Sequence, residues 1–191
     1  MLAALKERPG AYLVAIAGIP GAGKTTLSAQ MRTRLPHSMV LPMDGYHLQR
    51  AMLDSEGLRR RGAQHTFDSD ALRRDLERLR ESRQGDFPAF DHAEKDPRPG
   101  AVRIGPDTEV VIVEGLYLLM RAWRLEPLFD LTVFLDCDIE IALDRVAARH
   151  LECGLVDTPE AGRHRVESND RLNALVILAD GCRERADLVL G

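Results

Sequence analysis

The sequence predicts an α/β domain of three α/β/α layers, in which helices cover both faces of a mainly parallel five-stranded sheet. Short continuously apolar segments alternate along the chain with segments whose apolar residues recur every three or four positions. Strands that alternate with helices form parallel sheets buried on both faces. No internal repeat or long linker interrupts the pattern, so we expect residues 1–191 to form a single domain.

The first half of the chain is expected to contain two strands and the first long helix. A continuously apolar strand at residues 12–18 is followed by a helix that begins near Lys24 and ends before Pro36. A second strand, at 38–43, leads toward a stretch at 54–68 that is rich in arginine and glycine. That stretch has no periodicity, and we interpret it as a loop or a broken helix.

The middle of the chain adds a helix, an excursion and a third strand. Asp68 or Ser69 can cap a helix with a leucine stripe on one face. Several prolines then predict an extended excursion or hairpin at about 86–105 that stays outside the core. A buried strand follows at 110–113.

The last part of the chain supplies the remaining two strands and the helices between them. A strand is expected at 131–135, followed by a helix with one apolar face. Thr158 and Pro159 mark the start of another helix, which runs to about residue 179. A short strand at 188–190 is expected to complete the sheet.

Charge and composition exclude several classes of protein. The net charge of -4 argues against a general affinity for nucleic acid or for an anionic membrane. The three cysteines lack metal-ligand spacing and fit a reducing compartment. The apolar run at 11–19 is too short to span a bilayer, and Glu7 before it does not fit a signal peptide. We expect a cytoplasmic protein without a nucleic-acid or membrane partner, and a homodimer is one state it could adopt.

A phosphate-binding loop joins the first strand to the first helix. It matches the pattern G-x-x-x-x-G-K-[ST], with one further threonine after it, through Gly18, Ile19, Pro20, Gly21, Ala22, Gly23, Lys24, Thr25 and Thr26. Glycines let several backbone N–H groups converge on an anion, and the following helix adds its positive end. Lysine and threonine at these positions hold the β- and γ-phosphates and Mg²⁺. The pattern predicts a P-loop NTPase fold that binds ATP and Mg²⁺.

Two acidic residues follow predicted strands and favour a phosphotransferase. Asp44 follows the second strand and Glu114 the third, so both should face the γ-phosphate at the carboxyl edge of the sheet. One can accept a proton from a hydroxyl while the other holds Mg²⁺. The chain lacks an Asn-Lys-x-Asp motif of GTPases and the signature of transporter ATPases. A kinase that acts on a small molecule is the remaining expectation.

The acceptor side carries a recognisable set of motifs. They are Asp44-Gly45-Tyr46-His47-Leu48, Arg61-Gly62, Phe67-Asp68, Phe90-Asp91-His92 with Arg98, and Val113-Glu114-Gly115-Leu116. The first three resemble pantothenate kinase and its relatives, and the last two resemble uridine kinase. The chain from residue 12 to about 173 thus resembles the phosphoribulokinase/uridine kinase family, and within it the bacterial kinases named for fructose transport systems.

This resemblance implies roles for individual residues. Asp44 would be the general base, and Thr25, Glu114 and Asp44 would together form the site for Mg²⁺. The acceptor, a sugar, a nucleoside or a pantothenate-like molecule, would contact Asp44, Glu114 and a further set of side chains: Tyr46, His47, Arg61, Phe67, Phe90 and His92. Phe90 stands where uridine kinase has a tyrosine, which argues against a nucleoside.

Arginines are expected to complete the site. The resemblance implies a small helical lid at about 145–166 whose Arg145 and Arg149 steady the transferring phosphoryl group. A role for Arg163 and Arg165 is left open, and Arg59 and Arg60 are expected to be solvated. The other histidines, at positions 37, 65, 150 and 164, receive no role.

Two alternatives share the phosphate loop. One is a P-loop regulatory NTPase that hydrolyses ATP without a small-molecule acceptor. It would have little use for Asp44 and its neighbours or for the lid arginines. The other is a nucleoside monophosphate kinase, which would need more arginines along the acceptor side than residues 67–98 supply.

Overall fold

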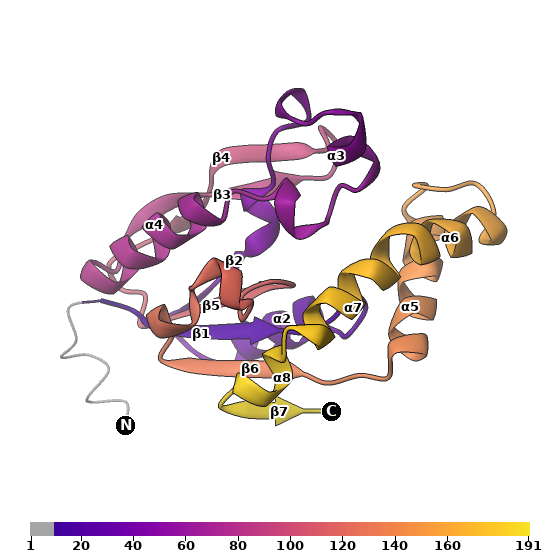
Figure 1. Cartoon of the computed structure of the whole chain (residues 1–191). Coiled ribbons are helices and arrows are strands. Elements are labelled where there is room, and N and C mark those ends of the chain that lie inside the picture. Colours follow the sequence, from indigo (N-terminus) through magenta and orange to yellow (C-terminus); the bar gives the residue numbers. More distant parts are fainter. Residues whose placement is uncertain (1–9) are drawn as a thin grey trace.

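A five-stranded sheet forms the centre of the computed structural model, which describes residues 10–191 (Figure 1). All its strands are parallel, in the order β2-β5-β1-β6-β7. The strands are β1 (Tyr12–Ala17), β2 (Ser38–Pro42), β5 (Val110–Gly115), β6 (Leu131–Leu135) and β7 (Leu188–Leu190). The predicted fold class is confirmed for the described residues. Residues 1–9, with the Glu7 used above, lie outside them.

Helices surround this sheet. The α-helices are α2 (Lys24–Arg34), α3 (Ser55–Arg59), α4 (Ser69–Glu81), α5 (Ile139–Glu152), α6 (Pro159–Arg165), α7 (Arg171–Ala179) and α8 (Cys182–Arg185). Short 3-10 turns are η1 (Met43–Tyr46), η2 (Arg50–Met52), η3 (Gln64–Thr66), η4 (Arg121–Trp123) and η5 (Glu126–Leu128), and η6 (Val166–Asp170) is a π-helix. The stretch at 54–68, expected to be a loop or a broken helix, contains α3 and η3 joined by a short loop.

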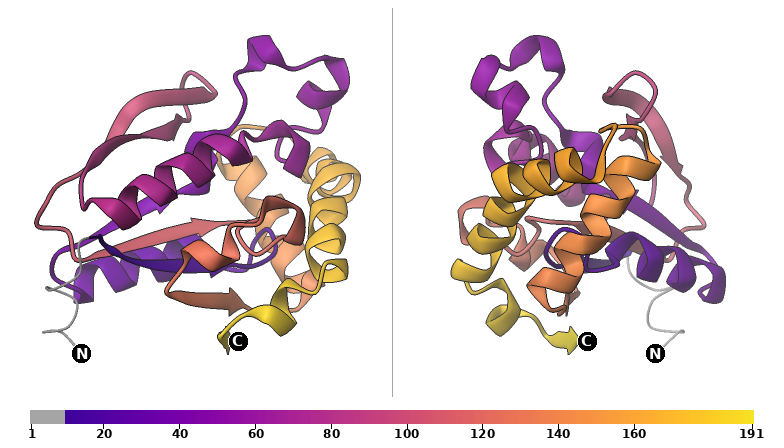
Figure 2. Two further views of the ribbon diagram at one scale, coloured as in Figure 1. Left: turned by 60° about the vertical axis from the view of Figure 1, so that its left-hand side comes forward. Right: turned by 90° about the vertical axis from the view of Figure 1, so that its right-hand side faces the viewer.

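The two faces of the sheet pack against different helices. Val14 and Ile16 of β1 point to the side that α2 covers with Leu27 and Met31. The alternate residues of β1 belong to the larger core, which includes the α4 leucines and residues of α7 and α8. Strand residues alternate between faces, so an apolar strand needs a cover on both. Figures 1 and 2 show the resulting three layers.

A hairpin forms a separate small sheet beside α4 (Figure 2). Its strands, β3 (Gly85–Asp91) and β4 (Asp96–Ile104), pair antiparallel, so the segment expected at 86–105 does form a hairpin. The expectation that it stays outside the core is wrong, because Phe87 and Ile104 are fully buried in the main core. Asp68 caps α4 by accepting a hydrogen bond from the Ala71 N–H at 2.8 Å. Leu72, Leu76 and Leu79 of α4 are fully buried, so the predicted leucine stripe faces the core.

The expected lid region consists of α5, α6 and the helical segment that returns to the sheet. Thr158 caps α6 as predicted, and its hydroxyl accepts a hydrogen bond from the Ala161 N–H at 3.1 Å. The helix expected to run to residue 179 does so, but it contains the π-helix η6 between α6 and α7. π-helical turns are often found at functional sites.

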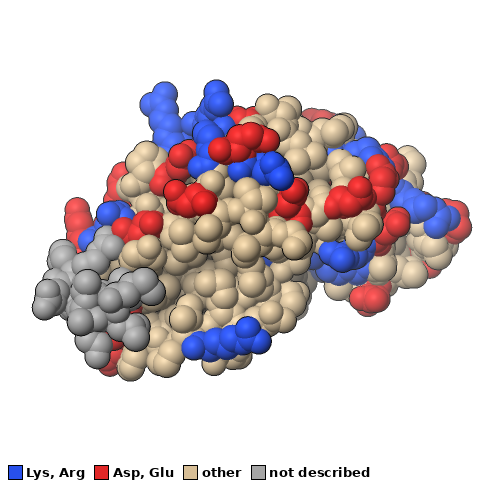
Figure 3. Space-filling model, turned by 90° about the horizontal axis from the view of Figure 1, so that it is seen from below, with Lys and Arg blue, Asp and Glu red and all other residues tan. Residues whose placement is uncertain are grey.

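Two surface properties complete the description. Every helix within residues 10–191 is too short or too polar to span a bilayer. On the face shown in Figure 3, acidic and basic side chains are interspersed around an uncharged middle.

Candidate active site

The phosphate loop, between β1 and α2, depends on glycines at two positions. Gly21 and Gly23 have φ angles of 80° and 99°, which other residues rarely adopt. A side chain at Gly21 would also collide with the backbone carbonyl of Ala142 in α5. The loop therefore folds as predicted and rests directly on the first turns of α5.

Lys24 is buried at the base of this loop. Its Nζ donates a hydrogen bond to the Ile19 carbonyl at 2.8 Å, and only 7% of the residue is exposed. Burial lowers the pKa of Lys24 to about 8, although the charges of Glu114 and Asp44 act in the opposite direction. A triphosphate would supply the negative charge that this buried ammonium lacks.

Thr25 and Glu114 meet at the edge of the sheet. The Thr25 hydroxyl donates a hydrogen bond to Glu114 Oε1 at 3.1 Å. Glu114 lies within β5 rather than after it, one residue before its end, and pairs in register with Ile16 and Pro42. Burial and the nearby Asp44 raise the pKa of Glu114, while Lys24 and Thr25 oppose this shift.

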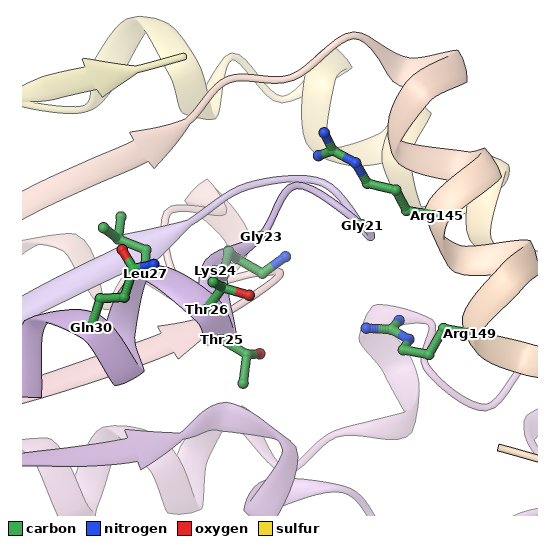
Figure 4. A pocket seen from close by; sticks show the side chains of 9 residues that line it. All are labelled: Gly21, Gly23, Lys24, Thr25, Thr26, Leu27, Gln30, Arg145 and Arg149. Carbon is green, nitrogen blue, oxygen red and sulfur yellow. The ribbon is translucent and has the colours of Figure 1, made fainter. Parts of the chain in front are cut away.

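A cleft of about 470 Å³ lies over the loop (Figure 4). Arg145 and Arg149 extend into it from α5, facing the loop as the lid hypothesis requires. Leu27 and Gln30 also line it, and sequence reasoning missed both. Gln30 lies four residues after Thr26, so helical spacing could have placed it on the same face. Arg163, in contrast, pairs with Glu160 on the surface.

Asp44 belongs to a segment that contacts both β5, which carries Glu114, and β3 of the hairpin, which carries Phe90. It belongs to η1, directly after β2, and is exposed. Its charge affects Lys24 and Glu114 on the nucleotide side and His47 on the other side. Asp44 therefore interacts both with residues predicted to hold the nucleotide and with a residue predicted to contact the acceptor.

An aromatic cluster lies on the far side of Asp44. His47 stacks on Phe67 with ring centroids 3.9 Å apart, and Phe90 lies 5.2 Å from His47. His92 contacts Phe90 at 5.3 Å and is exposed. Burial lowers the pKa of His47, and Arg61 adds to this effect, so a neutral imidazole is favoured. Four of the residues predicted to contact the acceptor therefore do lie together.

Two other residues predicted to contact the acceptor are held by the protein itself. Tyr46 is buried, and its hydroxyl donates to Asp75 of α4 at 2.8 Å. Arg61 donates to Asp96 at 2.7 Å and to the carbonyls of Leu48 and Lys95 at 2.9 and 2.5 Å. Arg61 therefore joins the loop before η3 to the β3-β4 hairpin.

The expectation of a solvated Arg60 is wrong. Its guanidinium donates to the Ser168 carbonyl at 2.7 Å and to Asn173 Oδ1 at 3.2 Å. Arg59 is exposed and pairs with Glu56, as a solvated residue can. Sequence reasoning could not separate the two, because the partners of Arg60 are more than 100 positions away in the chain.

Sequence reasoning also missed two aromatic residues behind the cluster. Tyr117 and Trp123 both contact Phe67, at 5.7 and 5.9 Å. The Tyr117 hydroxyl donates to the Gly62 carbonyl at 2.7 Å. Both residues lie after β5 in segments without regular periodicity, which left no signal to assign them to the site.

The donors of the site fit a magnesium nucleotide. Hydroxyl and carboxylate oxygens, as on Thr25 and Glu114, are the ligands that Mg²⁺ uses beside substrate phosphates. Within residues 10–191 no group of three acidic, histidine or cysteine side chains could hold an ion alone. An ion here would therefore need further ligands, which phosphate oxygens and water supply in nucleotide sites.

Comparison with known proteins agrees with this geometry. The model of the Phosphoribulokinase / Uridine kinase family matches residues 13–153. ATP-dependent kinase-like protein notR' of Aspergillus versicolor is 43% identical over 145 residues, which are 69% of this chain and 84% of that protein. A provisionally named uridine kinase of Schizosaccharomyces pombe is 35% identical over 178 residues, covering 84% of this chain and 75% of the relative.

A solved structure extends the likeness to almost the whole chain. The crystal structure of a provisionally named fructose transport system kinase from Silicibacter sp. TM1040 superposes with a TM-score of 0.85 at 36% identity. The match covers 97% of this chain and 92% of that one. Together with the phosphate loop and the matching family model, these findings show that the chain belongs to the phosphoribulokinase/uridine kinase family and is an ATP-dependent P-loop kinase.

Proposed function

We propose that this kinase transfers the γ-phosphoryl group of Mg·ATP to a hydroxyl group of a small metabolite that binds between Asp44 and the aromatic cluster. The observation that carries the proposal is the position of Asp44. Its charge acts on Lys24 and Glu114 in the nucleotide cleft and on His47 in the aromatic cluster. A general base for phosphoryl transfer must lie at such a junction.

The side chains divide the chemistry among them. Lys24 and the loop amides hold the phosphates, while Arg145 and Arg149 stabilise the charge that develops on the transferring group. Asp44 orients the acceptor hydroxyl and accepts its proton. Mg²⁺, with Thr25 and Glu114 as its protein ligands, would supply further positive charge to the phosphates. Catalysis is then positioning and electrostatics, with no covalent enzyme intermediate.

The sequence motif and the lid arginines also favour a kinase over a regulatory NTPase. A protein that only hydrolyses ATP needs no ordered aromatic surface beside its base. Here the half-buried rings of His47 and Phe90 form such a surface, and the buried Phe67 supports it from behind. ADP release with and without candidate acceptors separates the two functions, because stimulation requires an acceptor site.

Replacement of Asp44 tests the proposal directly. Asp44→Asn removes the base but keeps the shape of the side chain. We expect ADP release in the presence of an acceptor to fall by about 100-fold or more, with ATP affinity unchanged. Asp86→Asn, on the exposed hairpin, serves as the control. Near-normal turnover by Asp44→Asn would remove this residue from the proposed role.

A further inference from the structure

The strand β7 leaves one edge of the sheet open. Within residues 10–191 its sole neighbour in the sheet is β6. The strand at the opposite edge, β2, is contacted by β3 of the hairpin and ends at Pro42. Short length, charges and prolines are common ways to keep an edge strand from pairing. β7 is short, but it carries no charge or proline, and its residues are 41–48% exposed: Leu188, Val189 and Leu190.

The backbone of Val189 faces this open edge. The Leu190 carbonyl accepts a hydrogen bond at 2.6 Å from the N–H of Asp136, the residue after β6. Successive residues of a strand point their backbone groups in opposite directions, so the N–H and C=O of Val189 point away from β6. These two groups are the donor and the acceptor that a further strand would need.

The helix α7, shortly before β7, is apolar on its outer side as well as on its inner side. Its inner side packs on the main core through Ala174 and Ile177. Large apolar side chains on its outer side are 40–48% exposed: Leu172, Leu175, Val176 and Leu178. A helix that is apolar all round is normally covered on every side. The outer side of α7 is therefore a second surface that no other part of residues 10–191 covers.

These two surfaces lie close together at one end of the molecule. There α7, α8 and β7 follow one another along the chain (Figure 1). Figure 3 views the molecule from below, the side on which β7 lies, and the middle of that face is largely uncharged. A molecule that binds at the edge of β7 would thus come close to α7 as well. We call the seven exposed residues named above the α7-β7 surface.

The basic residues of α7 and α8 are paired within the chain. Their ion pairs have N–O distances of 2.6–2.9 Å: Arg171 with Glu140 and Glu167, Arg183 with Asp136, and Arg185 with Asp180. These two helices and β7 therefore offer no uncommitted cation to a nucleic acid or to anionic lipid headgroups. The α7-β7 surface is complementary to another apolar, uncharged surface that also presents a strand edge.

We propose that a second copy of this chain covers the α7-β7 surface, and that the two β7 strands pair antiparallel around a twofold axis at Val189. Each Val189 N–H then donates to the Val189 carbonyl of the other copy, which satisfies both groups. The two sheets join into one continuous sheet. The nucleotide cleft is lined by residues of α2, α5 and the phosphate loop, so it stays open in both copies.

The α7-β7 surface suits its own copy for two reasons. In a twofold interface each residue near the axis meets itself, so an unpaired charge would face a like charge. This surface brings only apolar residues and paired arginines to the axis. In addition, a stable dimer buries about 800 Å² of each partner, which three strand residues alone cannot supply. Antiparallel pairing about an axis normal to the sheet keeps both α7 helices on the same face, where their outer residues supply further contact.

The mass of the whole protein in solution tests the proposal. Light scattering at about 10–100 μM protein should give twice the chain mass of 21.3 kDa. A monomer at the highest of these concentrations would overturn the proposal. The nucleotide site plays no part in this measurement, so the result is independent of the proposed kinase function.

Three variants locate the contact. Leu175→Glu introduces like charges between the copies and should raise the dissociation constant of the dimer by about 100-fold or more. Val189→Pro should do the same, because it removes the N–H that bonds to the other copy and none that bonds to β6. Leu58→Glu on α3 is the matched control, since Leu58 is 44% exposed and Leu175 48%, and it should leave the dimer intact.

ATP affinity measured by calorimetry shows whether each variant is folded. A dimer that Leu175→Glu leaves unchanged, or that Leu58→Glu weakens equally, would contradict the α7-β7 surface. This comparison decides the matter even if Val189→Pro does not fold.

Hydrogen exchange tests the strand pairing without any substitution. The Val189 amide should be protected at concentrations at which the dimer forms and should lose this protection on dilution to the monomer. The Leu190 amide, which points toward β6, is the internal control and should keep its protection. Rapid exchange of the Val189 amide in a dimer of proven mass would refute the pairing of the two β7 strands.

Discussion

Lys24 offers a measurement that connects burial to the chemistry of the phosphate loop. Its ammonium is almost completely buried, and burial lowers its pKa from 10.5 to about 8 in the nucleotide-free protein. In the unfolded chain the ordinary value applies. Between pH 8 and 10.5 Lys24 therefore binds more protons in the unfolded state than in the folded state. Its contribution to the free energy of unfolding must rise with pH over this range.

The size of this rise follows from the difference between the two pKa values. One pKa unit corresponds to about 1.4 kcal/mol, and the difference is about 2.5 units, so Lys24 destabilises the nucleotide-free protein by about 3 kcal/mol below pH 8. Most of that penalty is gone by pH 10. Lys24→Met removes the charge, so the variant should be more stable than wild type near pH 7 and lose its advantage toward pH 10.

Urea unfolding of both proteins at several pH values between 7 and 10 measures the effect. The difference in unfolding free energy between them is the quantity of interest, because titrating groups that do not interact with Lys24 contribute equally to both. Lys95→Met, which changes an exposed lysine, should follow wild type at every pH. If the unfolding free energies of Lys24→Met and wild type change in parallel from pH 7 to 10, then burial does not lower the pKa of Lys24 as described above.

Two further substitutions test parts of the fold that hold the site. Arg61→Ala removes the ion pair and the carbonyl contacts that attach the hairpin, so the free energy of unfolding measured in urea should fall by about 1–3 kcal/mol. Arg59→Ala, at the exposed neighbouring position, is the control and should change stability by less than about 0.5 kcal/mol. Equal effects of the two substitutions would contradict the role of Arg61 in attaching the hairpin. Gly21→Ala would bring a methyl group against the Ala142 carbonyl, at a position where the backbone has a left-handed φ angle. Because both effects distort the phosphate loop, ATP affinity measured by calorimetry should fall by more than about 10-fold. Unchanged affinity would mean that the loop accommodates the methyl group.

Most of the fold could be predicted because each element carries a local signal. Continuous apolar runs marked all five strands, and the caps Asp68 and Thr158 marked two helices at the observed positions. Boundaries were less certain, since Glu114 proved to lie inside β5. The π-helix η6 was not predictable, because its apolar spacing does not differ enough from that of an α-helix.

The candidate site was predictable on its nucleotide side and only partly on its acceptor side. The residues of the phosphate loop are contiguous, so one motif located them, and the structure brings Glu114, Arg145 and Arg149 to them. Their catalytic roles and the movement of a lid remain predictions. The contacts that join Arg60 and Arg61 to residues 168–173 gave no signal, because they connect positions more than 100 apart in the chain.

The packing of Trp123 has a practical consequence. It is the single tryptophan of the chain, and it lies 5.4 Å from Tyr117 and 5.9 Å from Phe67, on the acceptor side of Asp44. Fluorescence excited at a wavelength that tryptophan absorbs and tyrosine does not therefore comes from one indole in one known environment. Spectroscopy without any label would observe the acceptor half of the molecule separately from the half that holds the nucleotide.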